Sequence, residues 1–425
     1  MVDCRTAARL LARLGVSVDP SPGRAVLCAA DVERVEAPYE LVKTMRASFL
    51  ALGPLLARFG EARVATPGGC AIGSRPVDIH LTGLACLGAE IAHSHGYVTA
   101  RAPAGGLRGA RVVLPFPSVG ATENIMLAAA LARGTTVIEN AAREPEIVDL
   151  GSVLAAMGAA VRGTGTAVVE VEGRERLHGF HHRVIPDRIE AGTFLIAAAA
   201  AGGEVTVEGA RADHLEALLE KLVEAGVEID AADSGLRVRR RGPLAPVDVT
   251  TAPYPGFPTD LQAQFMALMC FAAGQSTITE TIFENRFMHV QELARMGADI
   301  RVEGAGAVVR GGAPLEGAPV MATDLRASVC LVVAALAAQN TTRLQRVYHL
   351  DRGYEGIEVK LSGLGASIER VPEQRPAPQE VVAAAALMTR PRLGVRPASE
   401  PAHDSTATER AAEARRSRRR VRARE

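Results

Sequence analysis

The sequence predicts an α/β protein in which six similar units of about 70 residues form two domains of three units each. One recurring eight-residue pattern supports this prediction. Its positions are, in order, an apolar residue, two variable residues, a small or apolar residue, Gly, a small residue, a variable residue, and Ile or Val. Such a junction is typical of a helix that ends at a left-handed glycine and leads directly into a strand. It recurs at residues 11–18, 84–91, 154–161, 222–229, 293–300 and 361–368.

A second junction alternates with the first. An Ala- and Leu-rich helix ends at Gly or Asn and a β-branched strand follows, at residues 57–60, 132–137, 201–205, 273–277 and 338–342. Each unit should therefore contain two helices and several short strands, because amphipathic helices need a sheet to cover. One period before Gly60 lies upstream of Met1, so we expect the first unit to be incomplete, without its leading helix and strand.

The break between the third and fourth units is expected near residues 184–186, which gives domains at 1–183 and 184–371. A cleft between two such domains is a common place for a ligand. Residues 372–425 are rich in Ala, Pro, Glu and Arg and are expected to form a disordered tail. The Arg-rich run at 415–424 is compatible with a nucleic-acid-binding arm, but a solvated tail is favoured.

Charge and hydropathy argue against several classes of function. The 425 residues contain 48 Lys plus Arg and 48 Asp plus Glu, so no net charge draws the molecule to nucleic acid or anionic lipid. No apolar run reaches the roughly 18 residues of a spanning helix, and residues 1–15 lack a leader pattern. We therefore expect a cytoplasmic protein without a membrane or nucleic-acid partner. The absence of GxxxxGK[ST], HExxH and GxSxG motifs argues against P-loop hydrolysis and zinc proteolysis.

The cysteines differ in their surroundings. Six cysteines without a CxxC pair predict free thiols rather than a disulfide framework or a zinc site. Cys70 lies in the loop 66–80, which contains three glycines and two prolines. Exposed there beside Arg75, its thiol could serve as an acid, a nucleophile or a metal ligand. Four others lie in apolar helix or strand sequences and are expected to be inert core residues: Cys28, Cys86, Cys270 and Cys330.

Charged residues in small-residue contexts are further candidates. Asp260 follows Phe-Pro-Thr at the start of a predicted helix, where capping the helix and catalysis are equally compatible with the sequence. His80 and His289 could be bases, although a structural role is more common for a histidine. Five arginines could together clamp phosphate or carboxylate groups, since a planar guanidinium fits two oxygens: Arg46, Arg75, Arg286, Arg326 and Arg352.

Several long segments, among them Pro-Gly-Gly-Cys at 67–70, closely resemble the UDP-N-acetylglucosamine 1-carboxyvinyltransferases, enolpyruvyl transferases of the EPSP synthase-like superfamily. The segments are residues 37–48, 67–80, 118–122, 140–146, 186–190, 257–260, 283–289, 322–328 and 351–354. The resemblance covers about residues 1–371. It implies two inverted α/β domains, each of three similar βαβαββ-type units.

The resemblance also implies a reaction: the enolpyruvyl group of phosphoenolpyruvate passes to the 3-prime hydroxyl of UDP-N-acetylglucosamine and phosphate is released, the first committed step of peptidoglycan synthesis. No metal or organic cofactor is implied. One group must protonate the methylene carbon of phosphoenolpyruvate, another must take the proton of the sugar hydroxyl, and cations must hold the phosphate and carboxylate.

By the same resemblance, the acid that also forms a covalent adduct falls on Cys70, and the aspartate that faces the sugar hydroxyl falls on Asp260. The arginines that bind the anionic groups fall on Arg75 and Arg352. Further substrate contacts fall on Arg46, Pro76, Val77, Asp78, Ile79, Ser118, Val119, Ile282, Arg286 and Asp324.

The sequence departs from the family pattern in three places. A Lys-Asn pair that binds phosphoenolpyruvate in the family would lie upstream of Met1, Phe116 stands where the family often carries Lys, and the tail has no counterpart. Two alternatives therefore remain beside an active enolpyruvyl transferase. One is a catalytically impaired or non-enzymatic UDP-sugar-binding paralogue. The other is the same fold with shikimate 3-phosphate as acceptor, against which the Pro-Gly-Gly-Cys loop argues.

Overall fold

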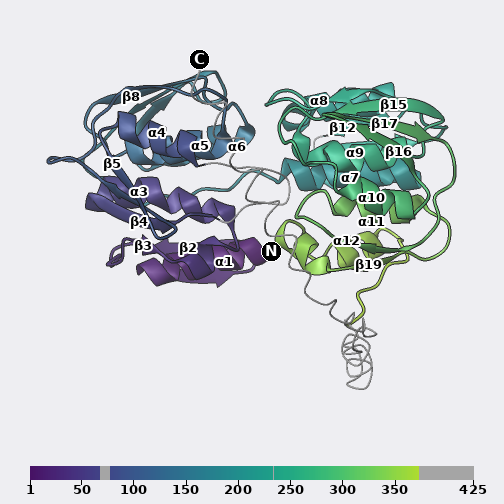
Figure 1. Ribbon diagram of the computed structural model, residues 1–425, viewed down its shortest axis with the longest axis horizontal. Helices are drawn as coiled ribbons and strands as arrows, with labels where there is room; N and C mark the ends of the chain where they lie inside the picture. The colour runs from purple at the N-terminus through teal and green to yellow at the C-terminus, as the bar shows by residue number, and fades with distance from the viewer. Residues whose placement is uncertain (68–76, 233, 373–425) are drawn as a thin grey trace, which may run out of the picture. The chain divides into compact units, whose positions relative to one another are not determined.

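The computed structural model describes residues 1–67, 77–232 and 234–372, of which Met1–Ile368 form one compact unit (Figure 1). Helices and strands alternate along this unit as the sequence predicts. Its first half contains α1 (Val2–Leu14), β1 (Ser17–Ser21), β2 (Arg24–Cys28), β3 (Glu36–Ala37), α2 (Tyr39–Val42), η1 (Arg46–Ala51), α3 (Leu52–Phe59), β4 (Glu61–Ala65), α4 (Asp78–Cys86), β5 (Glu90–Ser94), β6 (Tyr97–Arg101), β7 (Arg111–Val113), α5 (Val119–Ala129), β8 (Thr135–Glu139), α6 (Pro145–Ala156), β9 (Ala160–Arg162) and β10 (Val168–Glu172).

No helix or strand lies between β10 and α7, which begins at Arg188. The second half contains α7 (Arg188–Ala201), β11 (Gly203–Glu208), η2 (Ala212–His214), α8 (Glu216–Glu224), β12 (Glu228–Ala232), β13 (Gly235–Arg240), β14 (Val249–Thr250), α9 (Thr259–Met269), β15 (Gly274–Thr279), α10 (His289–Arg295), β16 (Asp299–Glu303), β17 (Gly306–Gly311), β18 (Pro319–Met321), α11 (Val329–Ala337), β19 (Arg343–Gln345), η3 (Val347–Arg352) and α12 (Ile357–Gly363).

Five of the six predicted helix-to-strand junctions are confirmed. Each of the six junction glycines has a positive φ, between 87° and 105°, a conformation in which a side chain is unfavourable. These glycines follow α1, α4, α6, α8, α10 and α12, and in the first five cases a strand begins within a few residues. The sixth case departs from the prediction: after Gly365 the described residues continue without a strand.

The sheets repeat as the junctions do. Three of them have four strands, in the orders β3-β4-β6-β5, β7-β8-β10-β9 and β14-β15-β17-β16. In each, the first pair is parallel and the other pairs are antiparallel. The other described sheets are shorter: β1-β2, β11-β13-β12 and β18-β19. One strand-helix-strand-helix-strand-strand pattern thus recurs with parts omitted.

Alternation within the strands sets which face is buried. In β13, Leu236 and Val238 are each 1% exposed, while Arg237 and Arg239 between and beyond them reach solvent. In β10, Val169 and Val171 are fully buried in the same way. The apolar face of such a strand is buried only if it packs against helices. The helices therefore lie on that side of the sheet.

Helices α7, α9 and α11 pack against one another, with the strands of the second half outside them (Figure 1). They are apolar around most of their circumference, which is the composition of a fully buried helix. Leu195 of α7, Phe265 of α9 and Val329 of α11 all have no exposed surface. In the first half, α5 packs in the same manner against α3 and α4.

The hydrophobic core is divided along the sequence. One cluster runs from Leu10 to Val171, a second from Ile189 to Ala334, and a smaller one surrounds Tyr354. The boundary between residues 183 and 184 stays a prediction, since 1–368 form one compact unit. The predicted tail lies almost wholly outside the described residues. Among the helices of the described chain, none has the length and apolar character needed to cross a membrane.

Two predictions about the cysteines are wrong. Cys28 and Cys86, expected in the core, are exposed, whereas Cys270 and Cys330 are buried. Cys28 ends a strand of the two-stranded sheet β1-β2, which has little cover, and Cys86 ends α4 on its outer side. Apolar neighbours in sequence therefore did not reveal which side of each element faces solvent.

Candidate functional site

Three helix starts converge in the first half, and each begins at or next to a predicted substrate-binding residue. Helix η1 begins at Arg46, α4 at Asp78 and α5 at Val119. Their junction is a buried polar centre at Asn124 of α5, whose amide group donates to Nδ1 of His80 at 3.2 Å. The same side chain links η1 and the start of α3, donating to the carbonyl of Phe49 and accepting from the N–H of Gly53.

His80 is held as a structural residue in this centre. Its ring meets that of Phe49 edge to face, with 5.4 Å between the centroids. Burial, and secondarily the positive charge of Arg46, lower the pKa of His80 to about 4. The imidazole is therefore neutral near pH 7 and accepts the hydrogen bond from Asn124. Of the two roles considered for His80, its surroundings favour the structural one.

The other predicted residues of this region lie around the same helix starts. Val77 is buried and precedes α4, and Ile79 packs on the core. Ser118 is the N-cap of α5, and its hydroxyl accepts from the N–H of Ala121 at 3.4 Å. Cys70, Arg75 and Pro76 lie outside the described residues.

A second group of predicted residues surrounds the start of α9. Nη2 of Arg286 donates to Oδ1 of Asp260 at 2.7 Å. The Arg286 side chain is only 4% exposed, whereas that of Asp260 is 42% exposed. The sequence-based N-cap assignment for Asp260 is wrong: Pro258 is the N-cap, and Asp260 is the second residue of the helix, without a side-chain capping bond. Its carboxylate accepts the hydrogen bond of Arg286 instead.

Charge balance defines the ionisation of this pair. Burial by itself raises the pKa of Asp260, but Arg286 and Arg326 outweigh it, and the pKa lies below its ordinary value. Burial likewise opposes the charge of Arg286, while Asp260 and Asp324 raise its pKa above its usual range. Both groups are therefore ionised at neutral pH.

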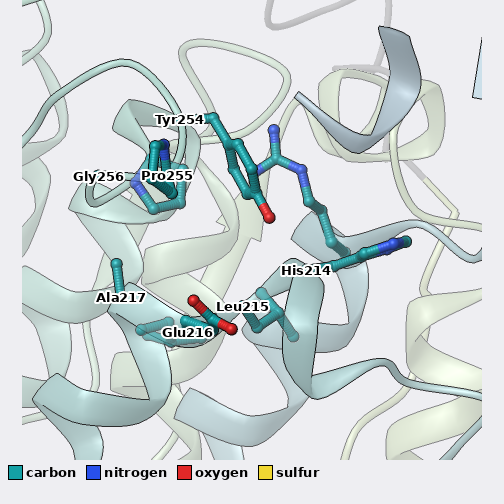
Figure 2. A pocket seen from close by; sticks show the side chains of 10 residues that line it. His214, Leu215, Glu216, Ala217, Tyr254, Pro255 and Gly256 are labelled. Carbon is teal, nitrogen blue, oxygen red and sulfur yellow. The ribbon is translucent and has the colours of Figure 1, made fainter. Parts of the chain in front are cut away.

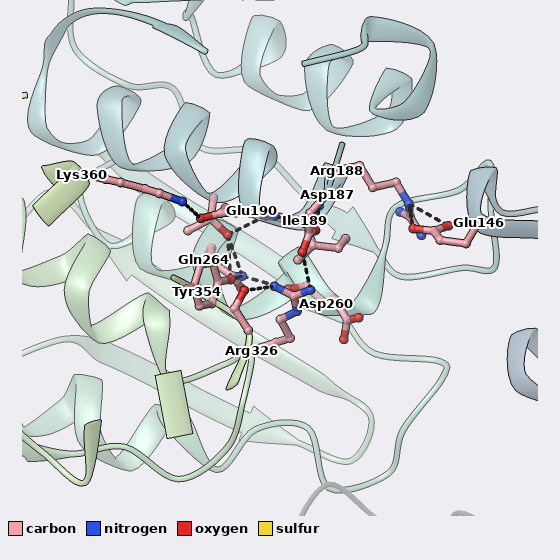
Figure 3. A network of polar contacts seen from close by, with 12 residues as sticks. Glu146, Asp187, Arg188, Ile189, Glu190, Asp260, Gln264, Arg326, Tyr354 and Lys360 are labelled. Atoms are coloured by element: carbon pink, nitrogen blue, oxygen red, sulfur yellow. Dashed lines mark hydrogen bonds and ion pairs between the residues drawn. The ribbon is translucent and has the colours of Figure 1, made fainter. Parts of the chain in front are cut away.

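Arg326 connects this region to two other segments (Figure 3). Its Nη2 donates to Oδ2 of Asp187 at 2.9 Å, and its Nη1 donates to the carbonyl of Gly353 at 3.2 Å. Asp187 also caps α7, since its other carboxylate oxygen accepts from the N–H groups of Ile189 and Glu190. The guanidinium therefore ties the start of α7 to the segment that carries Arg352.

Gln264, one turn along α9 from Asp260, extends the network (Figure 3). Its Nε2 donates to the carbonyl of Asp260 at 2.8 Å and approaches the hydroxyls of Thr193 and Tyr354. Those two hydroxyls lie 3.0 Å apart. The tyrosine ring, 1% exposed, thereby packs α7, α9 and the segment after η3 together.

The remaining predicted residues lie at the ends of neighbouring segments. Asp324 accepts from the N–H groups of Arg326 and Ala327, which orders the turn before α11. The guanidinium of Arg352 binds both carboxylate oxygens of Asp3, at 3.0 and 3.2 Å. Two parallel bonds of this kind are the geometry in which arginine holds a carboxylate or phosphate.

Ile282 and His289 complete the set. Ile282 follows β15, and its backbone N–H donates to the carboxylate of Glu280 at 2.8 Å. His289 is 1% exposed, and burial lowers its pKa to about 3. A neutral, enclosed imidazole of this kind is a core residue, which decides against a base at His289.

A small cavity lies elsewhere, beside the start of α8 (Figure 2). Its volume of about 10 Å³ admits a single water molecule and no nucleotide sugar. Arg188, which follows Asp187, and the segment around Pro258 relate it to the candidate site. Its lining residues are Arg188, His214, Leu215, Glu216, Ala217, Leu218, Tyr254, Pro255, Gly256 and Pro258.

Sequence reasoning missed the residues that hold the candidates in place. Asn124, Glu280 and Gln264 are buried polar side chains whose partners are mostly distant in sequence. The available signal was weak: a polar residue inside an otherwise apolar helix or strand. Chemically, the assembled groups offer an ionised carboxylate beside fixed guanidinium groups, which suits an anionic substrate and removal of a hydroxyl proton.

Comparisons with known proteins add to this geometry. Residues 1–361 match the family described as EPSP synthase (3-phosphoshikimate 1-carboxyvinyltransferase). Relatives from Gluconacetobacter diazotrophicus and Rhodospirillum centenum, both named UDP-N-acetylglucosamine 1-carboxyvinyltransferase, are 60% and 59% identical to this chain. In each case the match covers 88% of this chain and 89% of the relative.

Solved structures agree in fold. The enolpyruvyl transferase NikO from Streptomyces tendae is 27% identical, with a TM-score of 0.77 over 87% of this chain and 88% of that one. An EPSP synthase from Acinetobacter baumannii, 19% identical, has a TM-score of 0.64 over 86% of this chain and 87% of that one. The second likeness concerns the fold alone.

Proposed function

The chain belongs to the UDP-N-acetylglucosamine 1-carboxyvinyltransferases of the EPSP synthase family, and from this membership we propose that it transfers the enolpyruvyl group of phosphoenolpyruvate to UDP-N-acetylglucosamine and releases phosphate. The observation that carries the proposal is the 60% identity to a relative of that name over 88% of the chain. A non-enzymatic binding paralogue is not favoured, because relatives at this level of identity bear the name of the enzyme.

The reaction requires two proton transfers, one from the sugar hydroxyl to a base and one from an acid to a carbon atom. The sugar hydroxyl loses its proton as its oxygen bonds to the central carbon of phosphoenolpyruvate, and the methylene carbon gains one. Loss of phosphate and of a methyl proton then restores the double bond. We assign the first removal to Asp260, whose carboxylate is ionised and 42% exposed, and the delivery to carbon to Cys70.

Binding of the substrates is proposed to involve both groups of candidate residues. Arg75 and Arg352 would hold the anionic groups of phosphoenolpyruvate. The helix starts at Arg46, Asp78 and Val119 would contact the UDP-sugar. The sugar hydroxyl would lie near Asp260, whose orientation Arg286 fixes.

The remaining proposals concern the setting of the reaction. As a step of peptidoglycan synthesis, it would contribute to cell wall biogenesis and so to cell shape, the cell cycle and division. We propose a cytoplasmic location, with no nucleic-acid partner, as the balanced charge predicts. The reaction as written consumes no metal or organic cofactor.

Phosphate release by the purified chain tests the function. Phosphoenolpyruvate is supplied with UDP-N-acetylglucosamine in one assay and with shikimate 3-phosphate in a matched one. We expect release only with the UDP-sugar, together with a product heavier than the UDP-sugar by one enolpyruvyl group in mass spectrometry. Release only with shikimate 3-phosphate would instead assign the chain to the other acceptor.

A further inference from the structure

We infer that Glu280 is a positioning residue for the transfer, whose buried carboxylate fixes both the segment that carries Ile282 and the start of the helix that carries Asp260. The inference rests on the proposed function. Glu280 follows β15 directly and is 3% exposed. A buried carboxylate is unfavourable unless donors surround it, so its contacts identify what it holds.

One carboxylate oxygen holds the turn after β15. Oε1 of Glu280 accepts from the backbone N–H groups of Ile282 at 2.8 Å and Phe283 at 3.2 Å. It also accepts from the hydroxyl of Thr251 at 2.9 Å. This oxygen therefore holds two successive backbone N–H groups of the turn that carries Ile282.

The other oxygen holds the start of α9. Oε2 accepts from the hydroxyl of Thr259 at 2.8 Å. Thr259 is the first residue of the helix and precedes Asp260, and its hydroxyl makes this long-range contact. The carboxylate of Glu280 thus joins two segments. One carries Ile282, the proposed sugar contact, and the other carries Asp260, the proposed base.

Thr251 closes the arrangement from the end of β14. Its hydroxyl accepts from the N–H of Thr281 at 2.9 Å, and its carbonyl accepts from the hydroxyl of Thr281 at 2.6 Å. Thr251 has no exposed surface. With Glu280 at its centre, this ring of hydrogen bonds leaves the turn little freedom to shift.

The turn after β15 and the start of α9 also contact each other through the Asp260–Arg286 pair. The guanidinium of Arg286 lies over the ring of Phe283, 5.4 Å from its centroid, and also donates to Asp260. Glu280 holds the backbone N–H of Phe283, so it orients the arginine as well as the helix. Burial lowers the pKa of Arg286, but the charges of Asp260 and Asp324, and to a smaller extent that of Glu280, raise it above its usual value.

Three variants separate positioning from simple stabilisation. Thr259→Val removes only the Oε2 contact, Thr259→Ser restores it, and Glu280→Gln keeps one oxygen acceptor but removes the charge. Asp248→Asn is the control, since this exposed carboxylate accepts from the N–H of Thr277 in β15 away from the site. The steady-state constants for both substrates and the melting temperature are measured for each protein.

We expect Thr259→Val to lower kcat by about tenfold with little change in KM, because a small displacement of a reacting group is costly. Thr259→Ser should recover most of the rate. Glu280→Gln should also raise KM for the UDP-sugar by about fivefold, since Ile282 loses its fixed position. Asp248→Asn should leave kcat and KM unchanged.

The outcomes distinguish the inference from the function on which it rests. Lowered melting temperatures for the Thr259 and Glu280 variants, with wild-type kcat and KM, would show that Glu280 serves stability alone. A wild-type chain without transfer to the UDP-sugar would overturn the proposed function itself. Loss of kcat in Thr259→Val without recovery in Thr259→Ser would also count against the inference.

Discussion

Nη2 of Arg286 lies 2.7 Å from Oδ1 of Asp260, and the arginine is enclosed while 42% of the aspartate side chain remains accessible. The arginine is thus a fixed support, and the carboxylate projects from it toward solvent. A carboxylate held by one oxygen has its second oxygen available for a ligand hydroxyl. This arrangement motivates the first prediction.

Asp260→Asn should lower kcat by about a hundredfold or more, since an amide cannot accept the proton of the sugar hydroxyl. The free energy of unfolding should fall by only about 1–2 kcal/mol, because an amide oxygen still accepts from Arg286 and the site is partly solvated. Phosphate release and urea unfolding measure the two effects. Asp213→Asn, which removes the negative charge of the exposed pair with Arg211, is the control. Near-normal turnover in Asp260→Asn would refute the catalytic assignment.

His80 should make the stability depend on pH. Its pKa in the folded chain is about 4, against an ordinary value of 6.5. As the pH falls from 6.5 toward 4, the unfolded chain takes up a proton that the folded chain refuses, so the free energy of unfolding decreases. Above pH 6.5 His80 causes no loss of stability. Below pH 4 the free energy of unfolding is lower by the full amount, about 3 kcal/mol.

Urea unfolding at several pH values between about 4 and 7 measures this loss. His80→Gln should flatten the curve, while His93→Gln, at an exposed position of β5, should not. His289, with its pKa near 3, and His214 and His349, whose pKa values burial also lowers, contribute in the same direction, so part of the pH dependence should remain in His80→Gln. An unchanged pH dependence in His80→Gln would contradict the buried neutral state.

Cys70 should be the thiol that an epoxide analogue of phosphoenolpyruvate alkylates, because Arg75, five residues away in the sequence, should attract the anionic reagent. Three exposed thiols, Cys4, Cys28 and Cys86, serve as internal controls for non-specific labelling. Burial raises the pKa of Cys270 to about 12, so it should react only after unfolding. Peptide mass mapping reads the pattern.

Substitutions extend this test of Cys70. Cys70→Asp should retain some activity, since a carboxylic acid can also deliver a proton, whereas Cys70→Ala should retain none. Labelling of Cys86 with Cys70 untouched would contradict the assignment. Equal labelling of all exposed thiols would show that no substrate-like binding directs the reagent.

Asn124→Leu should destabilise the chain by about 3 kcal/mol or more, because the N–H of Gly53 and the carbonyl of Phe49 lose their buried partner. The starts of η1, α4 and α5 should then shift, and KM for the UDP-sugar should rise. Gln275→Leu replaces an exposed amide and is the matched control. Wild-type stability in Asn124→Leu would show that the hydrogen bonds of Asn124 with Gly53, Phe49 and His80 contribute little.

The sequence was informative about local geometry. A helix that ends at a glycine can be recognised from a few neighbouring residues. All six junction glycines, from Gly15 to Gly365, have the expected left-handed conformation. The strand expected after Gly365 is missing because a strand needs a neighbour to pair with, and that requirement is not local. The parallel pairing of β14 with β15 likewise depends on contacts that no sequence period records.

The site was predictable only in part. The resemblance singled out Asp260 and Arg286, and the structure brings them together. It could not reveal that Thr259 gives its hydroxyl to Glu280, about twenty residues away, because the partners of a buried polar group are fixed by tertiary packing. The same reason explains the mistaken capping role of Asp260: proline at 258 already has the extended conformation of an N-cap.

The six left-handed glycines differ in the space that each leaves for a side chain. A side chain at Gly297 would meet no atom within 4 Å and would incur only the conformational penalty, whereas one at Gly15 would come within 2.6 Å of a backbone oxygen. Strands on both sides of Gly88 pair in the sheet β3-β4-β6-β5, and the same holds for Gly158 in β7-β8-β10-β9 and Gly297 in β14-β15-β17-β16. A segment cut from glycine to glycine would separate strands that pair with each other, so a unit moved whole to another chain would have to end in the loops between sheets.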